Sequence, residues 1–133
     1  MQKKSGNDSK RKKTINILTG KLGIKVQLNE TKTAKELLEI LPISSNVNRW
    51  GDEIYFSISL KADIENGIEE VDIGTVAFWP PGSALCIFFG KTPVSQGDKP
   101  QAASPVTVIG NIINIEIIKE LGKVRNGEKI CCK

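Results

Sequence analysis

Apolar and polar residues alternate along several stretches of the chain, and this alternation predicts β-strands. The clearest stretch is 53–60, in which every second residue is apolar. Its apolar face is formed by Ile54, Phe56, Ile58 and Leu60. Its other face is polar apart from Tyr55. We therefore expect a strand with one buried face and one exposed face.

Alternation also predicts strands at 14–19 and 24–28, and we expect further strands at 71–79, 83–89, 105–110 and 128–132. The first two form a hairpin with glycines at the turn. Between the 71–79 and 83–89 strands stands Pro80-Pro81-Gly82, and we expect a rigid corner there because proline donates no ladder hydrogen bond. Asn126-Gly127 is a strong signal for a two-residue hairpin turn.

Two segments have helical character. In 33–41 the leucines recur at helical spacing, Thr31 or Thr33 can cap the start, and Pro42 ends the helix. A second short helix is permitted at 115–121, before Gly122. The segments 42–52, 61–70 and 91–104 are predicted to be loops. Seven or eight short strands with one or two helices are typical of a closed or nearly closed barrel, which leaves no exposed strand edges.

The positive charge is concentrated at the N-terminus. The chain has 133 residues, enough for one domain, and a formal net charge of +4. Residues 1–13 carry six basic side chains against Asp8, so the rest of the chain is close to neutral. We expect 1–13 to be a disordered basic tail and 14–133 to be the folded domain. The tail could contact nucleic acid weakly, and we expect no other nucleic-acid partner.

The residue inventory excludes several chemistries. The chain contains no histidine, so neither a Ser-His-Asp triad nor a Cys-His pair can form, and we expect no metal and no cofactor. Cys86, Cys131 and Cys132 have no ligand-like spacing, which fits a reducing cytoplasm. Cys86 lies inside an apolar run, where we expect its thiol to pack as a small core residue. No apolar run approaches the ~20 residues that span a bilayer, so no membrane association is expected. The polar N-terminus is not a secretory signal.

Three sequence blocks resemble a known family. They are Asn48-x-Trp50-Gly51-x-Glu53-Ile54-Tyr55-Phe56, then Gly74-x-Val76-x-x-Trp79-Pro80-Pro81-Gly82-x-Ala84-Leu85-Cys86-x-Phe88-Phe89-Gly90-x-Thr92-Pro93, and finally Val108-Ile109-Gly110. Over roughly 14–133 the chain is similar to the small prokaryotic cyclophilin-like family of unknown function. The resemblance implies a mainly β fold: a closed eight-stranded cyclophilin-like β-barrel with one or two short capping helices.

This family is an atypical branch of the peptidyl-prolyl isomerase fold. In true cyclophilins an arginine, a Phe-x-x-Gln strand motif and a downstream tryptophan and histidine line an outer groove that grips proline. Here Tyr55 falls near the glutamine position, no tryptophan follows Trp79, and histidine is absent. Arg49 is the one arginine near the corresponding strand, displaced toward the loop. These departures argue against an efficient isomerase, and the catalytic residues, if any, stay unassigned.

The candidate ligand-binding residues gather around two loop–strand junctions; they are Arg49, Trp50, Glu53, Tyr55, Trp79 and Thr92. Each has an ordinary alternative role. The tryptophans could pack in the core, Arg49 and Glu53 could form an exposed pair, and Thr92 could cap a turn. Tyr55 stands out because it is an aromatic residue on an otherwise polar strand face.

The leading functional hypothesis is a protein that binds a small molecule or a peptide segment on the outer face of the barrel. A weak peptidyl-prolyl isomerase with Arg49 as its donor is one alternative. An interaction module whose basic tail contacts nucleic acid is another. The identity of the ligand, the occurrence of turnover, the oligomeric state and the roles of the tail, Cys131 and Cys132 stay open.

Overall fold

The computed structural model describes residues 13–133 of the chain. The predicted basic tail therefore lies outside the described residues, except for Lys13, which is the first residue of a strand. No helix in the described part is long and apolar enough to cross a membrane.

The described chain is mainly β, with ten strands, one α-helix and two 3₁₀ helices. The strands are β1 (Lys13–Thr19), β2 (Leu22–Leu28), β3 (Ile43–Asn46), β4 (Asn48–Arg49), β5 (Glu53–Ser57), β6 (Ile68–Glu70), β7 (Thr75–Trp79), β8 (Ala84–Phe88), β9 (Gln101–Ile112) and β10 (Lys129–Cys132). The helices are α2 (Lys32–Glu39), η1 (Pro80–Gly82) and η2 (Ile115–Lys123).

All strand pairs are antiparallel, and nine strands follow one path, β3-β10-β1-β2-β9-β7-β8-β5-β4, with β6 added beside β9. The ladder ends at β3 and β4, so hydrogen bonds do not close the sheet and the implied closed eight-stranded barrel is not confirmed. The chain itself nevertheless connects the two end strands, β3 and β4. Val47 alone separates β3 from β4, and its backbone bonds to Glu128 and Gly127.

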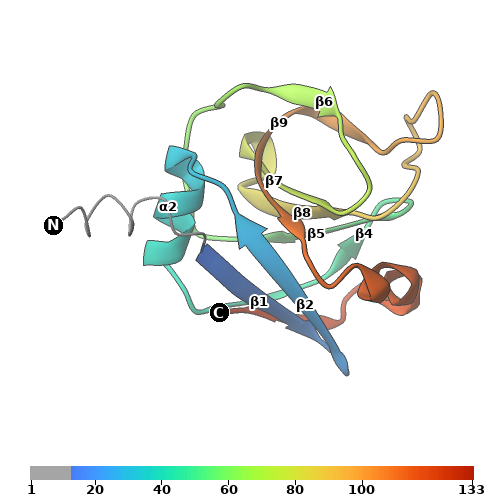
Figure 1. Cartoon of the computed structure of the whole chain (residues 1–133), viewed down its shortest axis with the longest axis horizontal. Coiled ribbons are helices and arrows are strands. Elements are labelled where there is room, and N and C mark those ends of the chain that lie inside the picture. Colours follow the sequence, from blue (N-terminus) through green and yellow to red (C-terminus); the bar gives the residue numbers. More distant parts are fainter. Residues whose placement is uncertain (1–12) are drawn as a thin grey trace, which may run out of the picture.

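The main core lies on the concave side of this sheet. Alternate residues of the central strands point into it, among them Ile54 and Phe56 of β5 and Leu85 and Ile87 of β8. Leu37 and Ala34 of α2 close one end, where Figure 1 shows the helix. Burial of this apolar surface, at roughly 25 cal/mol per Å², is the main force that holds the sheet in its curved form.

A second apolar cluster lies on the opposite face of β5, β7 and β8; its buried members are Val71, Ala77, Cys86, Phe88, Ala102 and Val106. It exists because β9 changes partners along its length. Residues near its start pair with β6, and residues from Thr107 onward pair with β7 and then β2. Pro105, which cannot donate to a ladder, lies just before Val106, the last residue that pairs with β6. The first part of β9 and β6 therefore form a separate layer over the central strands (Figure 1).

This layer corrects the prediction for 53–60. The apolar face is buried as expected, but Glu53 on the other face is buried too and Tyr55 is half-buried. The strand itself ends at Ser57. An antiparallel sheet with both faces covered needs a covering segment from elsewhere in the chain, and the alternation within 53–60 carries no information about that segment.

Several predicted loops contain short strands. The segment 42–52 holds β3 and β4, 61–70 holds β6, and β9 begins at Gln101 rather than at 105. All of these stretches are rich in polar residues, so hydrophobic alternation does not mark them. Asn126-Gly127 does form a turn, closed by the Glu128 amide donating to the Arg125 carbonyl, but η2 rather than a strand precedes it, so it makes no hairpin.

Both predicted helices exist with adjusted ends. Thr31 is the N-cap of α2 and its hydroxyl accepts from the Ala34 amide, whereas Thr33 is buried inside the first turn. The second helix is a 3₁₀ helix that continues one residue past Gly122 to Lys123. Its buried residue is Leu121, and Ile117 and Ile118 pack against the main core.

Candidate functional site

A cavity of about 200 Å³ lies between the central strands and the covering part of β9. It is lined by Trp50, Glu53, Tyr55, Trp79, Cys86, Ala102, Ala103 and Val106. Four of the six sequence-predicted site residues are among these. The cavity therefore occupies the face of β5, β7 and β8 that points away from the main core.

Strand register brings the lining residues together. Glu53 and Tyr55 lie two residues apart on β5 and so share one face. Tyr55 stands opposite Cys86 on β8, and Cys86 stands opposite Ala77 on β7. Trp79 is the last residue of β7, immediately before the Pro-Pro-Gly corner, as the sequence predicts. Trp50 follows β4, and its amide donates to the Glu53 carbonyl.

The aromatic side chains are divided between two places. Both tryptophans of the chain and its single tyrosine line the cavity, and all three are half-buried. The four phenylalanines are buried and none of them lines it. A cavity that contains every tryptophan and tyrosine of the chain differs in composition from the rest of the interior.

Trp79 is held in position from two sides. Its indole N–H donates to the Ser104 hydroxyl at 2.7 Å. On the other side lies Gly82, where an added Cβ would come within 2.7 Å of the indole Cζ3. The glycine of the Pro-Pro-Gly corner is therefore needed for close packing against the ring.

Glu53 places a carboxyl group in this mostly apolar cavity, and the residue is 5% exposed. Burial raises the pKa of Glu53 from its ordinary value of 4.5 to about 7, and a hydrogen bond with Cys86 partly offsets this rise. The pKa of the Cys86 thiol is raised well above its ordinary value, first by burial and then by the neighbouring Glu53. No lysine or arginine lines the cavity.

Arg49 lies outside the cavity and has a structural role. Its guanidinium donates to the carbonyls of Gly51, Gly122 and Val124 at 2.7–3.2 Å. It also lies 3.5 Å from a carboxylate oxygen of Asp52 and 5.2 Å above the centre of the Phe89 ring. The alternative of an Arg49–Glu53 pair is therefore wrong, because the partner is Asp52. The donor that the isomerase hypothesis requires is engaged within the fold.

Thr92 also lies outside the cavity lining. Its hydroxyl donates to the Gln101 carbonyl at 2.6 Å, and its amide donates to the Ser95 hydroxyl at 2.9 Å. These bonds match the turn-capping alternative for this residue. They fix the loop before β9. Ala102, which follows Gln101 in the chain, lines the cavity.

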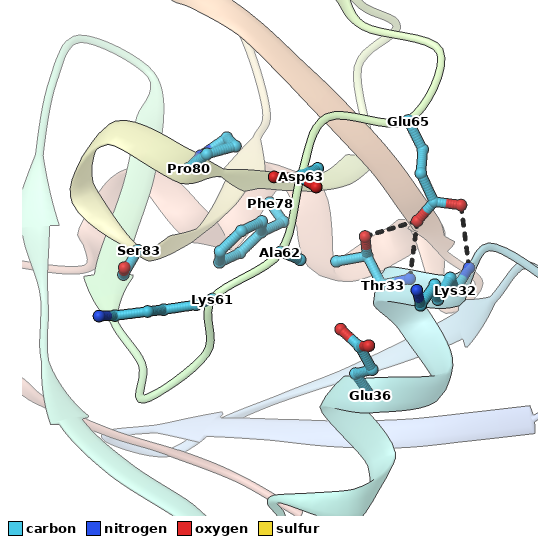
Figure 2. A pocket seen from close by; sticks show the side chains of 10 residues that line it. All are labelled: Lys32, Thr33, Glu36, Lys61, Ala62, Asp63, Glu65, Phe78, Pro80 and Ser83. Atoms are coloured by element: carbon cyan, nitrogen blue, oxygen red, sulfur yellow. Dashed lines mark hydrogen bonds between the residues drawn. The ribbon is translucent and has the colours of Figure 1, made fainter.

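A second, larger hollow of about 470 Å³ lies beside the start of α2. Figure 2 shows its charged rim, which includes Lys61 and Glu36, and Phe78 among its lining residues. The Glu65 carboxylate accepts from the Thr33 hydroxyl at 2.6 Å and from the Thr33 and Lys32 amides at 2.8 and 3.0 Å. This carboxylate thus satisfies the free amides of the helix terminus. We do not consider this hollow the candidate site, because its Glu65 carboxylate is already used in the fold and no predicted site residue lines it.

Sequence reasoning misses half of the cavity lining. Cys86 is predicted to be a small core residue, and Ala102, Ala103 and Val106 lie in or next to a predicted loop. Two of these side chains are only methyl groups, so nothing in their chemistry marks a site. The sequence holds one indication for Cys86: it lies two residues before Phe88 and therefore shares a strand face with that ring. Its position opposite Tyr55 depends on the strand register, which the sequence does not give.

Fold and cavity together define a small, mainly β protein with a candidate ligand site on the outside of its main sheet. The chain belongs to the cyclophilin-like family, whose model matches residues 13–133, as the resemblance implies. It is similar to a hypothetical protein from Archaeoglobus fulgidus, whose solution structure is known. The two chains are 38% identical and superpose with a TM-score of 0.77 over 92% of this chain and 94% of the other. No curated protein matches the sequence.

Proposed function

We propose that this protein binds a small organic molecule, or a short segment of a peptide, in the cavity between β5, β7, β8 and β9. One observation carries the proposal. Both tryptophans and the tyrosine of the chain meet in one cavity beside a buried carboxyl group. Ligand sites combine apolar and aromatic walls with a few well-placed polar groups, and this cavity has that composition.

The size of the cavity limits the ligand. Sites for drug-sized molecules measure roughly 300–1,000 Å³, and this cavity measures about 200 Å³. It can therefore enclose one small group or one side chain, with the rest of the ligand outside. The exposed Ala103 marks a part of the lining that is open to solvent.

The two tryptophans provide the test, because every tryptophan signal reports from the cavity. We expect a screen of metabolites and short peptides to yield a compound that changes tryptophan fluorescence and shifts both indole N–H resonances in NMR spectra. Tyr55→Ala should weaken the binding of that compound by about 30-fold, the size of a typical aromatic anchor. Lys61→Ala, in the other hollow, should leave binding unchanged. Resonance shifts that are scattered away from the cavity would contradict the proposal.

A further inference from the structure

The buried carboxyl group and the three aromatic rings point to one class of ligand. We propose that the cavity receives a methylated ammonium group, with the rings of Trp50, Tyr55 and Trp79 around it and the Glu53 carboxylate as its counter-ion. This inference rests on the proposed binding function and specifies its chemistry.

Glu53 has no cationic partner within the described chain. Three ion pairs occur among residues 13–133, and none includes Glu53. Arg49, four residues away, is bound to Asp52 and to main-chain carbonyls. The group that contacts Glu53 is the Cys86 thiol, a weak donor. A buried carboxylate is costly unless it is paired, so a cation from outside the protein would supply the missing partner.

The aromatic rings favour a cation over a neutral group. A cation within about 6 Å of an indole or phenol ring is attracted by the negative face of the ring, and methylated ammonium groups are commonly bound in this way. The indole N–H of Trp79 is already bonded to Ser104, so this residue offers a ligand its ring rather than a donor. Two indole rings and one phenol ring are among the groups that line this cavity of about 200 Å³.

Methylation follows from the scarcity of acceptors. An unmethylated ammonium group has three N–H donors, and each loses water on burial and must find an acceptor. Glu53 is the one strong acceptor side chain in the cavity lining, since the Tyr55 hydroxyl and the Cys86 thiol are weaker acceptors and the indole N–H groups only donate. A quaternary ammonium needs no acceptor. Its methyl groups can instead contact the rings and the side chains of Ala102 and Val106.

Choline and 3,3-dimethyl-1-butanol test the inference directly, because they share a shape and differ by the positive charge. We expect choline to bind at least tenfold more tightly than the neutral alcohol at pH 8, as measured by titration of tryptophan fluorescence. Equal or tighter binding of the alcohol would overturn the inference and leave the proposed binding function standing. Absence of binding by both choline and a trimethyllysine peptide would also overturn it, whereas the proposed function fails when no compound of the wider screen binds in the cavity.

Glu53→Gln keeps the shape of the side chain and removes its charge. We expect this variant to lose the preference for choline over the neutral alcohol, to less than about threefold. Glu36→Gln is the matched control, since it makes the same change in the other hollow and should keep the full preference. If Glu53→Gln also keeps it, the carboxylate is not the counter-ion.

The pH profile supplies a second readout. The titratable groups that face Glu53 are Cys86 on β8 and Tyr55 on β5, while β7 and β9 contribute none to the lining. Because the carboxylate form is about one-tenth populated at pH 6 and dominant at pH 8, choline should bind roughly tenfold more tightly at pH 8. A flat profile in the wild-type protein would contradict the role of Glu53.

The same chemical group occurs on free metabolites and on methylated lysine side chains. A short peptide that contains trimethyllysine, titrated beside choline, distinguishes these sources. Binding of either probe at least tenfold more tightly than the neutral alcohol supports the inference, and the tighter probe identifies the source. Failure of both overturns it.

Discussion

Glu53 makes the stability of this protein depend on pH in an unusual direction. Its pKa is about 7 in the folded protein and 4.5 ordinarily, so between these values the folded state holds a proton that the unfolded state has released. Stability therefore falls as the pH rises from 4.5 to 7 and levels off above that range. The shift corresponds to about 3 kcal/mol, since one pKa unit is about 1.4 kcal/mol.

We expect Glu53→Gln to remove this dependence. The free energy of unfolding, measured with urea at a series of pH values, should decrease between pH 5 and pH 8 in the wild-type protein and change much less in the variant. The comparison cancels other groups, such as Glu65, whose lowered pKa acts in the opposite direction at acidic pH. Parallel curves for the two proteins would show that Glu53 is not held protonated by burial.

Gly82 controls the position of the Trp79 ring. A methyl group at this position would lie 2.7 Å from the indole Cζ3, and the ring cannot swing away without losing its bond to Ser104. We expect Gly82→Ala to cost about 1–3 kcal/mol of stability and to shift the Trp79 indole N–H resonance.

Gly97→Ala is the control for this effect. Gly97 also lies in a turn region, has no strained φ, and nothing lies within 4 Å of the added Cβ. Its substitution should change stability by less than about 1 kcal/mol and leave both indole resonances in place. If Gly82→Ala is equally silent, the ring is not held against the corner.

At the scale of elements, the sequence predicts those whose own residues carry the signal. β5 follows from alternation, β7 and β8 follow from the apolar stretches on either side of Pro-Pro-Gly, and that corner follows from the covalent chemistry of proline. β3, β4 and β6 are not predictable in this way, because they are short and polar and exist through the strands they pair with. Secondary structure that is imposed by tertiary contacts leaves no local periodicity to read.

The same distinction applies to the site. Tyr55, Trp50, Glu53 and Trp79 are conspicuous in the sequence because they are aromatic or charged residues at strand ends or on an odd face. Arg49 and Thr92 share that conspicuous chemistry, yet the backbone carbonyls near them are their partners. A polar residue can face a cavity or can hydrogen-bond to the backbone of a neighbouring loop. The choice depends on distances in the folded protein, which one sequence does not contain.

The start of α2 depends on a carboxylate 33 residues away. Glu65 accepts from the Lys32 and Thr33 amides, which lack partners within the helix (Figure 2). We expect Glu65→Ala to cost about 1 kcal/mol, the usual cost of a lost helix cap, and to speed hydrogen exchange of these two amides.

Glu36→Ala serves as the control because Glu36 lies one turn further along α2 without a cap interaction. It should leave the exchange of the Lys32 and Thr33 amides unchanged. Unaltered exchange in Glu65→Ala would mean that Thr31, which bonds to the Ala34 amide, caps the helix without help from Glu65.

At the scale of the whole molecule, the two faces of the central strands have different roles. The concave face belongs to a large, mostly apolar core, while the outer face carries a small cluster with the cavity beside it. β9 contributes to both, because Ile109 points into the main core and Val106 lines the cavity. Substitutions in this one strand can therefore separate effects on stability from effects on ligand binding.

We expect Ile109→Ala to cost about 2–5 kcal/mol, the range for truncation of a large core side chain, with no change in the selectivity between choline and its neutral isostere. Val106→Ala removes two methylene equivalents and should cost about 1.5 kcal/mol. Because it enlarges a cavity of about 200 Å³, it should also weaken ligand binding severalfold. Urea unfolding and fluorescence titration of the two variants measure both quantities. If ligand selectivity follows stability in both variants, the outer face is not a separate binding layer.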